Sequence, residues 1–204
     1  GFFGYTNKET FTSVHGRFGG SIVQDGIVNA QWYDENGAQY SIPVNGPGSG
    51  SVDGRIMVNS PFGRESKFSV SSMTYARYSE SSSFIGKTGA FDTGTYYDPE
   101  TAEFDYDSFH EDFQNNGSEM FTRNKTQSVN FTQRLRFTFR NDLVELNIGG
   151  RTRYSKSWYT ITSSNQRATW NNQVDFSMNW TLPEGFGLVS DLDYNWYNGY
   201  TTQQ

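Results

Sequence analysis

The amino-acid sequence predicts an all-β fold, an antiparallel up-and-down meander of about eight long strands. Apolar and polar residues alternate with a period of two over long stretches, as they do in a strand with one wet face. Aromatic residues make up 17% of the chain although its mean hydropathy is −0.73. That combination suits a half-buried sheet, because disordered chains are poor in aromatic residues. Tight-turn sequences separate the alternating stretches.

The first half of the chain shows a weaker form of this pattern. Strands are expected at 10–18, 27–33, 52–59 and 66–79. The first two are expected to pair, joined through Gly19, Gly20 and Asp25-Gly26. Residues 45–50 read Asn-Gly-Pro-Gly-Ser-Gly, which cannot continue a strand and predicts a loop. A turn is expected at 61–64.

The alternation is strictest in the second half. Strands are expected at 128–140, 143–159, 169–182 and 186–196. In the first of them Phe137 and Phe139 share one face, whereas Arg134 and Arg136 share the other. A turn at Asn141-Asp142, a polar loop at 162–167 and a turn at 183–185 join these strands. The sequence predicts no helix.

Strand length and loop length both favour a membrane-type barrel. The expected strands of the second half run to about 12–16 residues, where soluble domains use about five or six and a membrane-spanning strand needs about 9–11. Short connections are expected at 61–65, 141–142 and 183–185, and long ones at 34–50, 80–125 and 160–168. Outer-membrane barrels alternate short periplasmic turns with long extracellular loops in this way.

The residue types on the two faces indicate which face meets lipid. Five arginines lie on the polar faces beside many Asn, Gln, Ser and Thr residues, as in a wet lumen: Arg134, Arg136, Arg140, Arg151 and Arg153. Trp and Tyr lie near the ends of the apolar faces, as in the aromatic girdles of membrane barrels. The alternative is a soluble or cell-surface β-sandwich that binds carbohydrate or protein. That alternative predicts that Phe137, Phe176 and Trp180 are buried between two sheets.

At this point the chain resembles a known family. Residues 129–140 (VNFTQRLRFTFR), 144–154 (VELNIGGRTRY) and 172–180 (NQVDFSMNW), with the turn that follows, look like outer-membrane barrels of the Bacteroidetes type. These are similar to the barrel region of TonB-dependent receptors, and the resemblance rests on strand texture over about residues 51–200. The family implies a 22-stranded barrel around a plug and a terminal aromatic residue, whereas this chain ends in Thr-Thr-Gln-Gln.

We therefore expect one β-barrel-type domain over residues 1–204 that is a portion of a larger barrel. The expected location is the bacterial outer membrane, and the expected function is uptake of a ligand or nutrient, with TonB-dependent coupling. Expected partners are outer-membrane lipid, a small-molecule, oligosaccharide or peptide ligand, and further subunits. A nucleic-acid partner is not expected, because the chain carries a net charge of −6.

The segment 80–125 is the candidate ligand-binding loop. It holds ten acidic and three basic residues, a net charge of −7, together with nine aromatic side chains. Tyr96, Tyr97, Phe104 and Tyr106 are the candidate ligand contacts, since exposed aromatic rings stack on sugars or on a protein partner. Such rings also pack a loop against itself. A solvated loop explains the acidic residues better than a calcium site, because EF-hand spacing is absent.

The sequence offers no catalytic or cofactor-binding set. There is no cysteine, which excludes disulfides, cysteine-zinc sites and thiol catalysis. His15 and His110 have no spaced partner for zinc or catalysis, and no Gly-x-Ser-x-Gly elbow occurs. The glycine-rich 46–50 lacks the Lys-Ser/Thr of a phosphate loop. We therefore expect neither an enzyme nor a cofactor.

Overall fold

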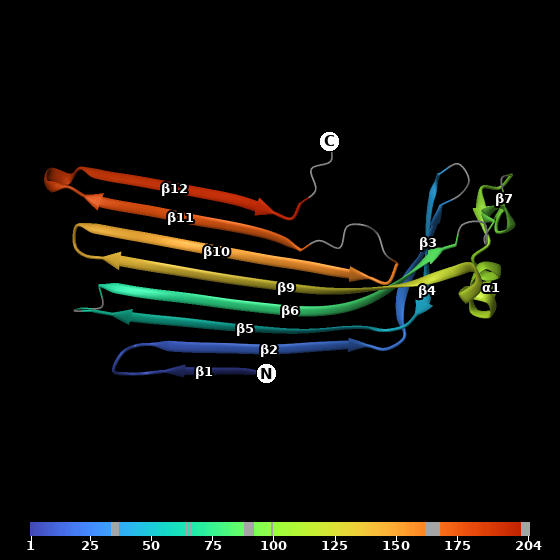
Figure 1. Cartoon of the computed structure of the whole chain (residues 1–204), viewed down its shortest axis with the longest axis horizontal. Helices are drawn as coiled ribbons and strands as arrows, with labels where there is room; N and C mark the ends of the chain where they lie inside the picture. Colours follow the sequence, from blue (N-terminus) through green and yellow to red (C-terminus); the bar gives the residue numbers. More distant parts are fainter. Residues whose placement is uncertain are drawn as a thin grey trace.

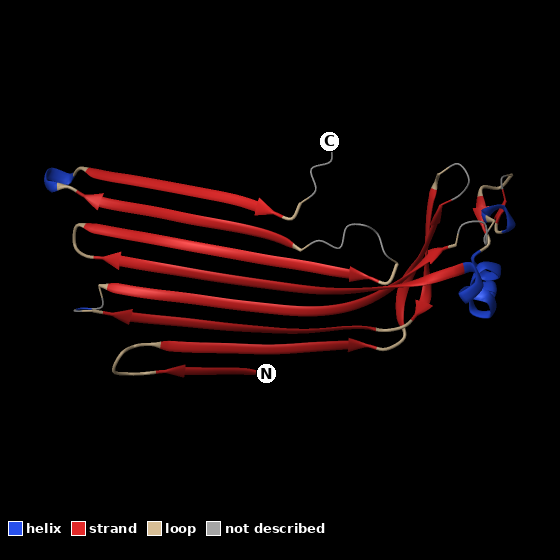
Figure 2. Cartoon of the chain, in the orientation of Figure 1, coloured by secondary structure: helices blue, strands red, loops and turns tan. Residues whose placement is uncertain are grey.

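The computed structural model describes residues 1–33, 37–63, 65, 67–87, 92–98, 100–161 and 168–200. It consists of a ten-stranded sheet, in which eight long strands form an antiparallel meander, with a small cap at one end (Figures 1 and 2). A short parallel pairing of β3 (Gly26–Tyr33) with β6 (Phe68–Gly86) joins the cap to the meander. The long strands are β1 (Phe2–Thr6), β2 (Ser13–Val23), β5 (Ser49–Phe62), β6 (Phe68–Gly86), β9 (Phe121–Arg140), β10 (Val144–Tyr159), β11 (Thr169–Thr181) and β12 (Gly187–Asn198). They lie side by side in that order, and each neighbouring pair is antiparallel.

The predicted all-β antiparallel meander is confirmed. The central strands are longer than expected, because β6 has 19 residues and β9 has 20. The sheet is not closed: among the described strands, β1 and β12 each pair on one side only. Its architecture is that of an open, partial barrel.

The cap consists of β3 (Gly26–Tyr33), β4 (Gln39–Gly46), the 3₁₀ turn η2 (Thr93–Thr95), β7 (Tyr97–Asp98), β8 (Glu103–Phe104) and α1 (Tyr106–Met120). The β3–β4 hairpin is inserted between β2 and β5, and α1 between β6 and β9. The short turns after β1, β5, β9 and β11 gather at the opposite end of the sheet (Figure 1). The predicted alternation of short and long connections thus gives the molecule two structurally different ends.

The prediction of a loop over residues 80–125 is wrong at both of its borders and in its middle. Strand β6 continues to Gly86, β9 begins at Phe121, and α1 occupies residues that were expected to contain no helix. Asp105 caps the helix, because its Oδ1 accepts a hydrogen bond from Ser108 N at 3.0 Å. The helix buries Phe109 against the cap, which stabilises it despite its polar sequence.

Two predictions for the first half are also wrong. Residues 10–18 and 27–33 do not pair: β2 runs through Gly19 and Gly20 to Val23 and pairs with β5, while β3 pairs with β4. Glycines are compatible with extended backbone, so two of them in a strand do not force a turn. The loop expected at 45–50 shrinks to Pro47-Gly48, since β4 ends at Gly46 and β5 begins at Ser49.

The hydrophobic core lies at the cap and not in the long sheet. The buried hydrophobic residues are Ala30, Trp32, Ile42, Val44, Tyr96, Phe109, Met120 and Phe121. Trp32 stacks on Tyr40 and on Phe109, with ring centroids 5.4 and 5.6 Å apart. Among the described residues, the eight long strands bury no hydrophobic side chain except Phe121, where β9 enters the cap. No helix in the described ranges has the length and hydrophobicity needed to cross a membrane.

Candidate functional site

One face of the long sheet is a continuous apolar surface, the belt. Residues that pair across antiparallel strands share a face, so the register defines it rung by rung. One rung contains Val70, Phe137, Ile148, Phe176 and Leu192, in order from β6 to β12. These side chains are open to the surroundings: Leu192, for example, is 65% exposed. An apolar surface of this extent marks an interaction site.

No second sheet covers the belt among the described strands (Figure 2). Trp180 is 41% exposed, and Phe137 and Phe176 are half-buried. The sandwich alternative predicted that these three side chains are buried between sheets, and the structure does not place them so.

Aromatic residues mark both limits of the belt. On β11, Trp170 and Trp180 share the apolar face and are separated by ten residues, or about 34 Å of extended strand. Trp170 packs on Tyr154 of β10, with ring centroids 4.7 Å apart. Tilted by about 40°, such a strand spans about 26 Å, close to the apolar height of an outer-membrane barrel.

A polar rung of Thr74, Gln133, Thr152 and Asn172 crosses the belt, and its members are hydrogen-bonded to one another and to Ser72 of the next rung. Thr74 Oγ1 donates to Gln133 Oε1 at 2.6 Å, and Thr152 Oγ1 donates to Asn172 Oδ1 at 2.7 Å. Gln133 Nε2 in turn donates to Ser72 Oγ at 3.0 Å. Polar groups in an apolar environment are tolerated when they bond to each other, so this rung does not break the belt.

The opposite face is polar, and four of its arginines form what we name the arginine cluster: Arg134, Arg136, Arg151 and Arg153. Arg134 on β9 lies directly across from Arg151 on β10. Arg136 lies across from Gly149, one rung away, and its Nη2 is 3.7 Å from Asp175 Oδ2 on β11. Arg134, Arg151 and Arg153 form no ion pair with any described residue, so the cluster keeps a net positive charge.

A depression of about 380 Å³ opens beside the cluster. Its polar-face lining includes Ser71, Met73, Arg134, Arg136, Gly149, Arg151, Gln173 and Asp175. Gly149 contributes to its shape, because a Cβ at that position would lie 2.3 Å from an oxygen of Asp175 and would displace that carboxylate. The depression is therefore bounded by arginine on two strands and by one carboxylate.

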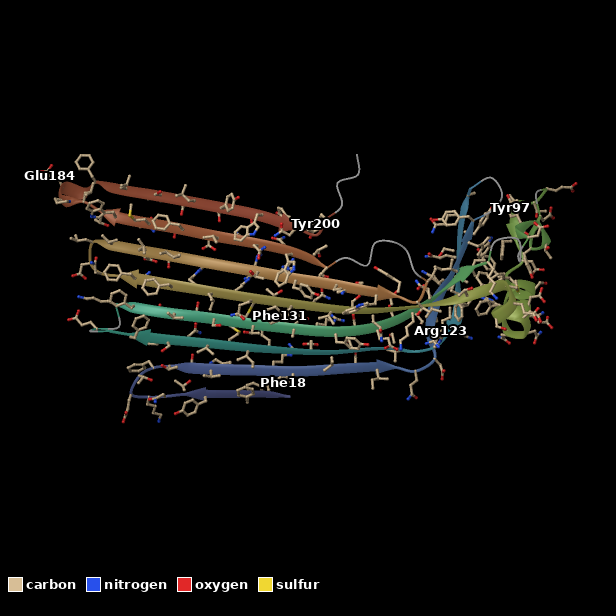
Figure 3. The ribbon with its side chains drawn as sticks, viewed as in Figure 1. Phe18, Tyr97, Arg123, Phe131, Glu184 and Tyr200 are labelled. Atoms are coloured by element: carbon tan, nitrogen blue, oxygen red, sulfur yellow. The ribbon has the colours of Figure 1, made fainter. Side chains whose placement is uncertain are left out.

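The four candidate ligand residues of the 80–125 segment divide into two pairs. Tyr96 and Phe104 belong to the packing of the cap: Tyr96 is 7% exposed, and the Phe104 ring lies 5.8 Å from that of Phe109. Tyr97 and Tyr106 are exposed, at 38% and 55%. Figure 3 shows Tyr97 in the cap, far from the turn that holds Glu184. The structure brings all four into the cap but not onto one open surface.

Two titratable groups in the cap, Tyr96 and His110, have structural partners. Tyr96 donates its hydroxyl to Asp112 Oδ2 at 2.6 Å. Burial, and then the hydrogen bond and charge of Asp112, raise the pKa of Tyr96 to about 12. His110 Nε2 lies 2.9 Å from the carbonyl oxygen of Pro43, which ties α1 to β4. Within the described ranges, no three His, Asp or Glu side chains are grouped as a metal site would need.

Sequence reasoning placed the arginines on a polar face but missed the depression beside them. Gly149, Asp175 and Met73 come together only through the pairing of four strands, β6, β9, β10 and β11. The tight turn after β9 does carry a signal, because a hairpin turn fixes the register that sets Arg134 opposite Arg151.

Comparisons with protein-family models, with curated proteins and with solved structures found no match for the chain.

Proposed function

We propose that the chain is part of a bacterial outer-membrane β-barrel that takes up a ligand, with the belt facing lipid and the polar face lining the lumen. The observation that carries this proposal is the exposed apolar belt on long strands, limited by tryptophans and backed by an arginine-rich face. A water-soluble sheet would have to cover such a surface. In a bilayer, lipid covers it and no protein layer is needed.

Among the described strands, β1 and β12 each have one unpaired edge, and these edges support a barrel with further strands. Every backbone group must be hydrogen-bonded inside a bilayer, so only a closed sheet is stable there. The missing strands come from elsewhere in a larger protein or from a second subunit. The cap, at the end with the long connections, corresponds to the extracellular side of such a barrel. Coupling to TonB remains an expectation from the resemblance alone.

Two adjacent residues on β10 allow a test that compares the faces at one depth. The chain has no cysteine, so Ile148→Cys and Asn147→Cys each provide a single site for a nitroxide label. Ile148 lies in the belt and Asn147 on the polar face. In phospholipid vesicles, the label at 148 is expected to collide with oxygen, which concentrates in lipid. The label at 147 is expected to collide with a water-soluble nickel chelate.

Equal access of the nickel chelate to both labels would contradict the proposal, since a water-exposed sheet has no lipid face. A stable, monodisperse monomer in buffer without detergent would also count against it. Circular dichroism of each labelled variant is the control that the strands have formed.

A further inference from the structure

We infer that the arginine cluster is a binding site for a small solute that carries two or more oxyanion groups, either phosphate or carboxylate. The inference deepens the proposed function and rests on it for the route of the solute, since the polar face would line the lumen. The site itself depends only on the packing of β6, β9, β10 and β11.

The first argument is the arrangement of charge. Arg134 and Arg151 are direct cross-strand partners, and like charges in that position destabilise a sheet. Arg136 and Arg153 are the diagonal neighbours of this pair on the same face. An anion between the guanidinium groups would turn mutual repulsion into attraction. No described residue supplies that anion to Arg134, Arg151 or Arg153.

The second argument is donor capacity. A guanidinium group has five N–H donors in a planar fork that matches the geometry of carboxylate and phosphate. The guanidinium groups of Arg134, Arg151 and Arg153 make no hydrogen bond to another described side chain, in contrast to Arg140, which bonds Glu145 at 2.6 Å. Arg140, beside the turn, is therefore ion-paired, whereas Arg134, Arg151 and Arg153, in the middle of the face, have N–H donors available for a ligand.

The third argument is space. The depression beside the cluster has a volume of about 380 Å³, which lies within the range of small-molecule sites. Gly149 leaves room between Arg136 and Asp175, and Gln173 adds an amide on the far side of Arg151. Asp175 disfavours an anion at its own edge. The ligand is therefore expected to bind over Arg134 and Arg151, away from β11.

The test is isothermal titration of the detergent-folded chain with pyrophosphate and, separately, with citrate. Arg134→Gln/Arg151→Gln removes both central forks, and binding is expected to weaken by about tenfold or more for each lost charge-assisted contact. Arg134→Lys/Arg151→Lys keeps the charge and removes the forks, so an intermediate loss is expected. Arg17 on β2 and Arg77 on β6 lie on the same face outside the cluster. Arg17→Gln/Arg77→Gln removes the same charge from that face and is expected to change affinity by about twofold at most.

Saturable binding that is lost in Arg134→Gln/Arg151→Gln and kept in Arg17→Gln/Arg77→Gln supports the site. Equal losses in both variants would overturn it, because they would show a diffuse electrostatic effect. Absence of binding by either probe would also overturn it. The nitroxide labels at residues 147 and 148 separate the two proposals: lipid exposure of residue 148 without anion binding rejects the site alone, and anion binding without lipid exposure rejects the membrane function alone.

Discussion

Tyr96 shows how a single side chain connects the parts of the cap. Its ring is buried against Phe104 and Phe109, and its hydroxyl reaches Asp112 on α1. The tyrosine thus links the segment before the helix to the helix itself. Tyr96 and Phe104 were candidate ligand contacts in the sequence. Their packing gives both a structural role, and the exposed Tyr97 and Tyr106 are the members of the set that a ligand can reach.

The raised pKa of Tyr96 makes the cap sensitive to alkaline pH. The folded-state pKa is about 12, above the value of about 10 for a free tyrosine, so the protonated phenol stabilises the fold. That contribution is complete below about pH 10 and is lost as pH rises from about 10 to 12. In an absorbance titration, Tyr96→Phe is expected to remove the phenol that ionises last. Tyr106→Phe, at an exposed site of the same cap, is the control and is expected to leave that late phase in place.

Tyr96→Phe is also expected to lower the stability of the cap at neutral pH by about 1 kcal/mol, the contribution of one hydrogen bond. The difference between variant and parent should shrink above pH 10. An unchanged late phase of the titration in Tyr96→Phe would show that another tyrosine is the protected one.

At the scale of the elements, the sequence predicted what depends on local period and missed what depends on distant contacts. The strand over 128–140, its turn at Asn141 and the strand that follows were predictable, because alternation and turn chemistry are local signals. Asn141 Oδ1 indeed accepts bonds from the backbone nitrogens of Leu143 and Val144, at 2.9 and 2.7 Å. The pairing of β2 with β5 was not predictable, because a whole hairpin is inserted between these strands.

Helix α1 left a signal that could have been used. Asp105 followed by Ser108 is a helix-start pattern, and Phe109, Phe113 and Met120 recur at helical spacing. The mean polarity of the segment and its Asn-Asn-Gly run argue for a loop, and the helix forms because Phe109 enters the cap. The depression beside the arginine cluster could not be foreseen, since Asp175 reaches Arg136 across β10.

Strand β11 carries its own prediction about depth in the bilayer. Trp170 and Trp180 lie at the two limits of the belt, so each should sit near a lipid–water interface. In variants that keep only Trp170 or only Trp180, the tryptophan fluorescence is measured with two lipid quenchers. A quencher near the headgroups is expected to lower the fluorescence more than a quencher at the bilayer centre. Trp32, buried in the cap, is the control and should respond weakly to both. Stronger quenching from the bilayer centre at both positions would contradict the placement of the belt.

The whole molecule combines two parts that are stabilised in different ways. The cap has its own aromatic core, whereas the long sheet has one apolar face without any protein partner among the described residues. Hydrophobic burial stabilises the cap in water, whereas the proposed function assigns the equivalent stabilisation of the sheet to lipid. The cap and the sheet should therefore respond separately to mutation.

Phe109→Ala tests this separation, because Phe109 is completely buried and contacts aromatic rings from β3, β9 and the segment around Tyr96. The substitution is expected to cost the cap about 3–5 kcal/mol. In detergent, a protease should then cut between β6 and β9 and leave two fragments, each with intact strands, since the sheet does not depend on this core. Tyr106→Ala, on the same helix but 55% exposed, should remain as resistant as the parent chain. If Phe109→Ala instead made the long strands themselves susceptible to cleavage, the cap and the sheet would form one cooperative unit. The core of the cap would then contribute to the stability of the long sheet.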